Sequence, residues 1–221
     1  MPRNAKESKK EPAANSPPEK YPGHPVDEDD LIRRLKHGQQ WACNTLVDLY
    51  QERLLKLAWG ITLDKEESRE IVQDIFFTAI KKIDTFRGES SLWAWLRKMT
   101  VNACLNWKRK WKRRFRWHHT PIETETMIPA QDGQTQEDTP ETLLQEKQAH
   151  KEVADAVARL PEDVRTAFVL CSFEGLSYQE IAQVLGIKKG TVSSRIFRAR
   201  QIISRSIEQN STPRNKRKNL L

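Results

Sequence analysis

The segment from Gly190 to Arg200 places hydroxyl, aromatic and cationic side chains on one side of a predicted helix. Each residue turns an α-helix by about 100°, so Ser194, Phe197 and Arg198 lie opposite its apolar positions. Arginine can make two hydrogen bonds to guanine in the DNA major groove, and a phenylalanine ring can contact a thymine methyl group. We therefore interpret this as a DNA-recognition helix, with contacts assigned to Lys189, Thr191, Ser193, Ser194, Arg195, Phe197 and Arg198.

A second stretch, residues 97–116, contains nine basic residues and no acid. Five of the seven tryptophans fall between positions 93 and 117. Cations that follow a phosphate backbone, together with flat aromatic rings, suit the binding of unpaired bases. For Trp93 and Trp95, core packing and a DNA-facing role are equally good interpretations. For the run 108–114, a nonspecific phosphate anchor is favoured over a merely soluble helix end.

The elements that position the recognition helix form a helix-turn-helix pattern. Ser177 and Glu180 have the spacing of a capping box, in which two reciprocal hydrogen bonds fix a helix start. Gly186 can adopt the left-handed conformation that ends a helix, and the next helix begins about three residues later, near Gly190. Because six basic residues and no acid lie between Glu180 and Glu208, a plain solvated hairpin is the weaker interpretation.

Composition divides the chain into five parts. Residues 1–26 contain six of the eleven prolines and few apolar residues, which predicts a disordered arm. Residues 27–112 have helical apolar periodicity, and residues 113–148 contain a long run with seven acids and no lysine or arginine, typical of a flexible linker. Residues 149–208 form the helix-turn-helix domain, and residues 209–221 a basic tail. The predicted fold class is therefore all-α: two small helical domains joined by a flexible linker, which we expect to tumble semi-independently.

Apolar residues in the first domain recur at steps of three and four, as on one face of a helix. The clearest stripe runs along residues 46–61, and similar stripes occupy residues 72–83 and 92–103. The segment 86–91 interrupts them as a loop, with Ser90 or Ser91 as the N-cap of the next helix.

The net charge of +8 favours an anionic partner such as nucleic acid but does not identify one. No stretch approaches the roughly 20 apolar residues that span a bilayer, and the N-terminus lacks the apolar run of a signal peptide. We expect a cytoplasmic protein without membrane insertion. Cys43, Cys104 and Cys171 are isolated within apolar helical patterns, so we interpret them as buried packing residues.

Four blocks in one chain resemble the extracytoplasmic-function (ECF) sigma factors of the bacterial sigma-70 superfamily. The last block alone would also fit the helix-turn-helix domains of response regulators, but all four in this order are highly specific. The blocks are Leu46-Val47-Asp48-Leu49-Tyr50; Ile71-Val72-Gln73-Asp74-Ile75-Phe76; Phe86-Arg87-Gly88-Glu89-Ser90-Ser91 with Trp95-Leu96; and Gly190-Thr191-Val192-Ser193-Ser194-Arg195 with Arg198-Ala199-Arg200.

The resemblance implies a subunit that binds core RNA polymerase and directs it to promoter DNA. The N-terminal domain would contact polymerase and the −10 element, and the C-terminal domain would recognise the −35 element. Gln73, Asp74 and Phe77 match the polymerase-facing motif, where Glu is commoner than Asp74. The loop 86–91 matches one that receives a base flipped out of the melted strand. The implied −10 and melting residues are Arg87, Gly88, Glu89, Ser90, Ser91, Trp95, Lys98, Asn102, Lys108, Arg109 and Lys110.

The resemblance also implies an anti-sigma partner, which in this family is often membrane-linked. Two positions depart from the family pattern. Lys188 stands where proline is usual, and Ser193 stands where a basic residue is frequent, which leaves the recognised −35 sequence open. The additional helical domain of housekeeping sigma factors has no counterpart here.

Two other classes of function compete with this interpretation. A dimeric helix-turn-helix repressor or activator would explain the C-terminal domain but not the basic tryptophan-rich stretch. For a nucleic-acid enzyme, residues 27–30 could hold Mg²⁺, although consecutive acids more often begin a helix. His118 and His119 lack a third metal ligand at useful spacing. Without a phosphate-binding glycine loop or a nucleophile with its base, we expect no enzymatic activity and no cofactor.

Overall fold

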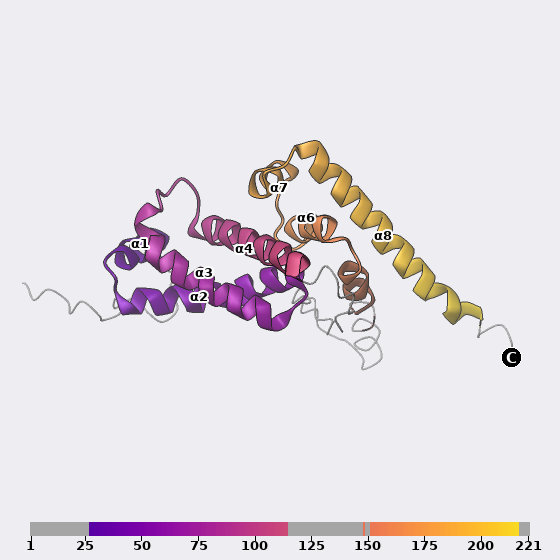
Figure 1. The fold of residues 1–221 in the computed structure, drawn as a ribbon, viewed down its shortest axis with the longest axis horizontal. Helices are drawn as coiled ribbons and strands as arrows, with labels where there is room; N and C mark the ends of the chain where they lie inside the picture. The colour runs from indigo at the N-terminus through magenta and orange to yellow at the C-terminus, as the bar shows by residue number, and fades with distance from the viewer. Residues whose placement is uncertain (1–26, 115–147, 149–150, 217–221) are drawn as a thin grey trace, which may run out of the picture.

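The structure, a computed structural model, describes residues 27–114, 148 and 151–216. Within these ranges the chain forms helices and turns but no strand (Figure 1), which confirms the all-α prediction. The predicted N-terminal arm and most of the predicted linker lie outside the described residues. The N-terminal unit consists of α1 (Glu28–Lys36), α2 (Gln40–Thr62), α3 (Lys65–Lys82), the 3₁₀ turn η1 (Ile83–Thr85) and α4 (Leu92–Arg114). The C-terminal unit consists of a helical stretch at residues 151–158, then α6 (Glu162–Ser172), α7 (Tyr178–Leu185) and α8 (Lys189–Lys216).

The acidic run at residues 27–30 begins helix α1, as the sequence predicts. Asp27 is the N-cap, and its Oδ1 accepts a hydrogen bond from the backbone N–H of Asp29 at 3.2 Å. The Asp30 carboxylate pairs with both Arg33 and Arg34. The neighbouring Glu28 accepts a hydrogen bond from the backbone N–H of Leu92 at 2.8 Å, so the start of α1 also satisfies the start of α4.

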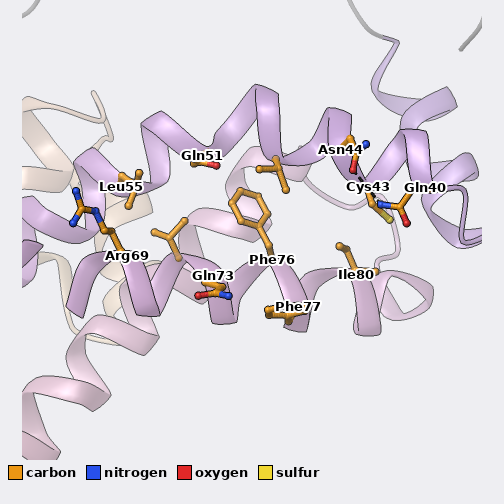
Figure 2. Close-up of a pocket in the computed structure, with 12 residues that line it drawn as sticks. Gln40, Cys43, Asn44, Gln51, Leu55, Arg69, Gln73, Phe76, Phe77 and Ile80 are labelled. Atoms are coloured by element: carbon orange, nitrogen blue, oxygen red, sulfur yellow. Dashed lines mark hydrogen bonds between the residues drawn. The ribbon is translucent and has the colours of Figure 1, made fainter. Parts of the chain in front are cut away.

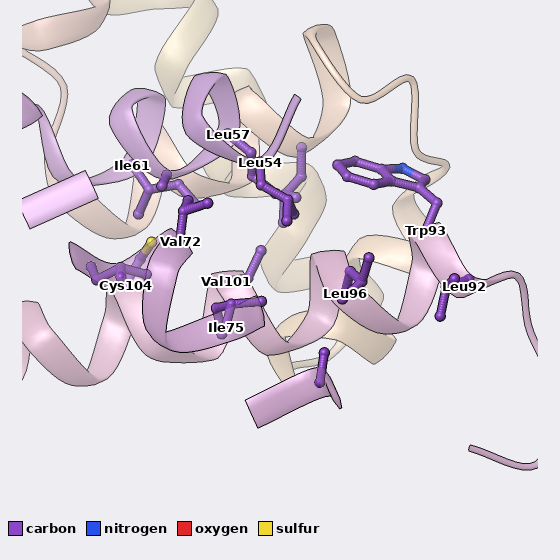
Figure 3. Close-up of a cluster of buried hydrophobic side chains, with 14 of the residues drawn as sticks. Leu54, Leu57, Ile61, Val72, Ile75, Leu92, Trp93, Leu96, Val101 and Cys104 are labelled. Carbon is purple, nitrogen blue, oxygen red and sulfur yellow. The ribbon is translucent and has the colours of Figure 1, made fainter. Parts of the chain in front are cut away.

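The core of the N-terminal unit forms where α2, α3 and α4 pack together (Figure 3). The predicted stripe on α2 faces inward, with Leu54 and Ile61 fully buried and Tyr50 half-buried. Helix α4 contributes Leu96 and Val101, neither of which is exposed. Burial of each large aliphatic side chain stabilises the unit by roughly 1.5–3 kcal/mol, so this packing determines how α4 is oriented.

The C-terminal unit has the predicted helix-turn-helix geometry. Both hydrogen bonds of the Ser177–Glu180 capping box are present, and Gly186 ends α7 at φ 66°. The apolar face of α8 is buried, with Val192 and Ala199 fully inaccessible to solvent. Helix α8 continues to Lys216, past the predicted end of the domain at residue 208.

The two units pack against each other, which differs from the expectation that they move semi-independently. Helix α2 contacts α6, and α4 contacts α7. Apolar side chains of the C-terminal unit, including Val169 and Ile181, join the same buried cluster as the core of the N-terminal unit. Gly60 lies at the closest approach of α2 and α6, since a Cβ at this position would meet Val169 Cγ1 at 3.3 Å.

Replacement of Leu96 tests this packing. Leu96→Ala removes a fully buried side chain, so we expect the free energy of unfolding to fall by about 2–5 kcal/mol. The exposed Lys98 on the same helix provides the control, because Lys98→Ala should change stability by no more than about 0.5 kcal/mol. Urea unfolding followed by far-UV circular dichroism measures both. Equal midpoints for the two variants would contradict the assigned orientation of α4.

Candidate nucleic-acid interface and apolar groove

Helix α4 has one apolar face, which packs on the core, and one polar face, which is open to solvent. No acid occurs anywhere in its sequence. The open face therefore has the composition of a surface that binds a polyanion. The residues of this open face are exposed or half-buried, and all but the adjacent pair at 109 and 110 follow one another at steps of three and four: Trp95, Lys98, Asn102, Asn106, Arg109, Lys110 and Arg113.

The loop before α4 is anchored at its base and exposed at its tip. Phe86 is buried and packs on Trp95, with the two ring centroids 5.3 Å apart. Lys36 Nζ donates a hydrogen bond to the Phe86 carbonyl at 3.3 Å, and Ser91 Oγ accepts one from the backbone N–H of Ala94 at 3.2 Å. Ser91 is therefore the side chain that caps α4, one of the two predicted candidates.

The tip of this loop, residues 87–90, is exposed to solvent. Gly88 has φ 73°, a conformation that side-chain-bearing residues adopt at a cost of about 1–2 kcal/mol. Arg87 and Glu89 flank it and lie 3.8 Å apart at their charged ends, but both side chains are about four-fifths exposed. An ion pair this exposed contributes little energy, so both groups remain available to a ligand.

Asn102 lies on the open face of α4 and is exposed. Its amide has no hydrogen bond to any other residue that the structure describes. It can therefore offer a donor and an acceptor to the edge of a base. Lys108 is half-buried, with its ammonium group 5.2 Å from the centroid of the Trp107 ring, so it belongs to the edge of this surface.

The structure distinguishes the two tryptophans that the sequence left undecided. Trp93 is buried, stacks on Tyr50 with centroids 6.1 Å apart, and lies under the Arg53 guanidinium at 3.9 Å. It is therefore a packing residue in this arrangement. Trp95 is half-buried against Phe86 at the base of the loop, where part of its ring is accessible.

The solvent face of α8 presents the side chains expected of a recognition helix. Phe197 is 64% exposed although it is a large apolar residue. Arg198, Ser193 and Ser194 are exposed beside it, and Lys189 is exposed at the start of the helix. Such a combination of an exposed aromatic ring, hydroxyls and cations suits contact with base edges and phosphates.

Two of the predicted recognition residues are less accessible. Thr191 is half-buried, and its backbone carbonyl accepts a hydrogen bond from Ser194 Oγ at 3.0 Å. Arg195 Nε lies 3.2 Å from Asp163 Oδ2 on α6, without hydrogen-bond geometry, and the Arg195 side chain is only 24% exposed. Arg195 thus lies at the edge of the recognition face and is held toward its own domain.

An apolar groove of about 390 Å³ lies along the surface where α2 and α3 meet and is lined by residues of both helices (Figure 2). Gln73 and Phe77, both predicted from the sequence, line it from α3, and Phe77 is 66% exposed. Asp74 is exposed on the same helix but does not line the groove. The α2 side of the groove was not predicted, although its residues recur at steps of four: Cys43, Val47, Gln51 and Leu55.

The cysteines differ in how completely they are buried. Cys104 is buried as predicted, and burial raises the pKa of its thiol to about 12, which makes thiolate chemistry at neutral pH unfavourable. Cys43 and Cys171 are only half-buried, although both pack against the buried core, and Cys43 also lines the groove. For these two residues the prediction of burial was wrong, whereas the predicted packing role is confirmed.

No group of three or more histidine, cysteine or acidic residues within the described ranges could hold a metal ion. His118 and His119 lie outside those ranges. None of the described helices is long and apolar enough to cross a membrane.

Comparison with known proteins relates these surfaces to a family. The model of sigma-70 region 2 matches residues 46–114, and that of sigma-70 region 4 matches residues 150–203. The chain is 34% identical over 186 residues to the ECF RNA polymerase sigma-E factor of Haemophilus influenzae, an alignment that covers 80% of this chain and 94% of that protein. The chain belongs to the ECF sigma factors. This sigma factor is also 32% identical over 181 residues to the RNA polymerase sigma-H factor of Pseudomonas aeruginosa, with 82% and 94% of the two chains covered.

Solved structures share the fold of this sigma factor. The sigma factor RpoE of Bartonella quintana, crystallised with the anti-sigma factor NepR, superposes with a TM-score of 0.59 and 26% identity. The match covers 75% of this chain and 96% of that one. CnrH, in complex with the cytosolic domain of CnrY, has the same fold with a TM-score of 0.54 and 22% identity. As a member of this family, the protein is an RNA polymerase sigma factor that acts in transcription initiation at promoter DNA.

Substitutions on the two basic surfaces should separate sequence recognition from phosphate binding. Arg198→Ala should cost about 1–3 kcal/mol in binding to a −35 duplex and relax selectivity at one base pair. Lys110→Ala should weaken binding to all sequences alike and reduce the salt dependence. Arg200→Ala is the matched control, because Arg200 is also an exposed arginine of α8 but is not among the residues assigned to −35 recognition. Fluorescence anisotropy on specific and scrambled duplexes measures the effects, and equal loss on both duplexes for Arg198→Ala would contradict the assignment.

Proposed function

We propose that this sigma factor recognises the −35 element through α8 and captures a flipped base of the −10 element at the junction of the 86–91 loop and α4. The observation that supports this most strongly is the open face of α4. It combines an unpaired amide at Asn102, a partly accessible ring at Trp95 and a row of cations. A protein that recognises double-stranded DNA needs only contacts to phosphates and base edges, whereas aromatic rings beside cations suit the binding of single-stranded DNA.

This arrangement would favour melting of the promoter DNA, because it would bind an unpaired base better than a paired one. Unstacking a base costs a few kcal/mol, which is regained only when the base fits a pocket that binds it. The exposed loop tip at Arg87 and Gly88 would approach the displaced strand, while Lys98, Arg109 and Lys110 neutralise its phosphates. We assign residues 27–112 to this role and to polymerase binding, and residues 149–208 to −35 recognition.

The α2–α3 groove is the proposed docking site for core RNA polymerase. Phe77 would lose its water contact on binding, and Gln73 would offer a polar contact at the rim. Exposed aromatic side chains beside an apolar groove frequently provide most of the energy of an interface. Asp74, beside the groove, would contribute a charged contact to a basic partner surface.

The complex of the related RpoE with NepR supports an anti-sigma partner for this chain as well. We infer that the protein has no catalytic activity of its own and acts in the cytoplasm.

Purified chain added to bacterial core polymerase and genomic DNA should produce transcripts from discrete start sites. Binding of the chain alone to a palindromic site, with no new transcripts, would instead indicate a dimeric regulator.

Asn102→Ala and Arg87→Glu should impair promoter opening while −35 binding remains intact. The reason is that both residues are exposed beside the proposed base pocket, far from α8 in sequence and without a core contact. Permanganate reactivity of −10 thymines in the polymerase complex measures the opening. A template with a pre-melted bubble should rescue both variants. If both variants open duplex promoters at the parental rate, the pocket lies elsewhere.

Phe77→Ala should weaken binding to core polymerase by about 2 kcal/mol or more, as expected for a central aromatic contact. Leu49→Ala is the matched control, because Leu49 is also apolar and 46% exposed but does not line the groove. Surface plasmon resonance with immobilised core polymerase measures both. Equal affinities for the two variants would rule out the groove as the docking site.

A further inference from the structure

The loop at residues 86–91 is held at both ends by a single helix, α1. At the first end, Lys36 Nζ donates a hydrogen bond to the carbonyl of Phe86 at 3.3 Å. At the other end, the backbone N–H of Leu92 donates one to Glu28 Oε1 at 2.8 Å. Glu28 and Lys36 are the first and last residues of α1, so the two ends of this helix hold the two ends of the loop.

These two contacts differ from the others that hold the loop. The packing of Phe86 on Trp95 and the cap that Ser91 provides to Ala94 tie the loop only to α4. The contacts from α1 tie it to a second helix that lies 50 and 64 positions away in the sequence. The tip, residues 87–90, is exposed throughout and gains little from packing of its own. Its conformation therefore depends on how its two ends are held.

Glu28 is itself held in place by the packed rings behind it. Its carboxylate accepts a hydrogen bond from the Tyr50 hydroxyl, and burial together with the charge of Glu28 raises the pKa of Tyr50. Tyr50 in turn stacks on Trp93, the second residue of α4. Arg53 lies over the same indole ring, and its Nη2 donates a hydrogen bond to Glu174 of the C-terminal unit at 3.1 Å. Glu28 thus has partners on both α2 and α4, and neither can move freely.

The position of the Glu28 carboxylate determines where α4 begins. The first N–H groups of a helix have no partner within the helix, and Leu92 is fully buried. A carboxylate satisfies such a group with a charge-assisted hydrogen bond and also suits the positive end of the helix dipole. Ser91 Oγ satisfies the N–H of Ala94 in the same turn. Without Glu28, the end of the loop and the first turn of α4 would lose the contact that fixes their register.

The selection of a flipped base needs this precision more than the binding of a phosphate backbone does. A binding site distinguishes similar groups only when its supporting residues hold it within a fraction of an ångström. The cations of α4 would still attract a strand beside a loosely held loop, because their attraction acts over several ångströms. Loss of the α1 contacts should therefore reduce the preference for one base more than the affinity for DNA.

We propose that Glu28 and Lys36 are positioning residues that hold the loop from α1 in the shape that selects the flipped −10 base. The proposal rests on the function proposed above, because it assumes that this loop captures a base. It gives a part in base selection to α1, a helix that supplies none of the residues of the proposed pocket.

Base preference in promoter opening tests the proposal. Polymerase reconstituted with each variant is assayed on promoters that carry each of the four bases at every −10 position. Glu28→Ala and Lys36→Met should each reduce the parental preference roughly fivefold, as expected for one lost hydrogen bond. Glu28→Gln retains an oxygen that can accept from Leu92, so it should keep most of the preference. Asp29→Ala and Lys81→Met remove exposed charges from α1 and α3 and should match the parent.

The preference separates positioning from a merely structural role. A structural role would lower the melting temperature and slow opening on all promoters alike, with the ratio between bases unchanged. A pre-melted bubble should restore the rate of opening in both variants but not the preference, because the base must still fit the loop. If Glu28→Ala loses helix content by circular dichroism, the exposed Lys36→Met decides the question.

The outcomes also separate this proposal from base capture itself. A parental preference in Lys36→Met, or in a folded Glu28→Ala, would overturn the positioning role while capture by the loop stands. If the parent prefers no base at any −10 position, the proposed capture fails, and the role of α1 fails with it.

Discussion

Helix α2 packs against α1, α3, α4 and α6, and the way these helices cover its sides is the constraint on which the rest of the structure depends. Its inner side, with Leu54 and Ile61, forms the core with α3 and α4. A second side, with Val47 and Leu55, is left half-covered and forms the groove. Near its C-terminus, Gly60 lets the C-terminal unit pack closely. Because a single helix supports the core, the groove and the contact between units, changes at one of these sites can affect the others.

Packing on α2 also explains the division of α4 into two faces. Burial of Leu96 and Val101 orients the helix, and the cations and amides are left on the opposite side. Repulsion among the cations is tolerable there because water and salt screen exposed charges. The side chains of the nucleic-acid surface are thus determined by which face of α4 packs into the core. The hydrogen bond from Leu92 to Glu28 and the packing of Phe86 on Trp95 fix where this surface meets the loop.

Features that depend on local spacing were predictable from the sequence. The capping box at Ser177 and Glu180, the glycine that ends α7 and the apolar stripes all follow from interactions within a few residues. The packing of the two units was not predictable, because Arg53 and Glu174 are 121 positions apart and each resembles an ordinary surface charge. The groove was missed for a different reason. A stripe such as Cys43 and Val47 has the same periodicity whether it is covered by protein or left partly open.

Site-specific photocrosslinking in one polymerase–promoter complex tests the central claim most directly. A photoreactive residue at position 102 should crosslink to the unpaired −10 strand, and one at position 197 should crosslink to the −35 duplex of the same DNA. The crosslink from position 102 should require core polymerase and disappear on a −10 duplex that cannot open. Crosslinks from position 102 to closed duplex, or from position 197 to both halves of a palindrome without polymerase, would contradict the account.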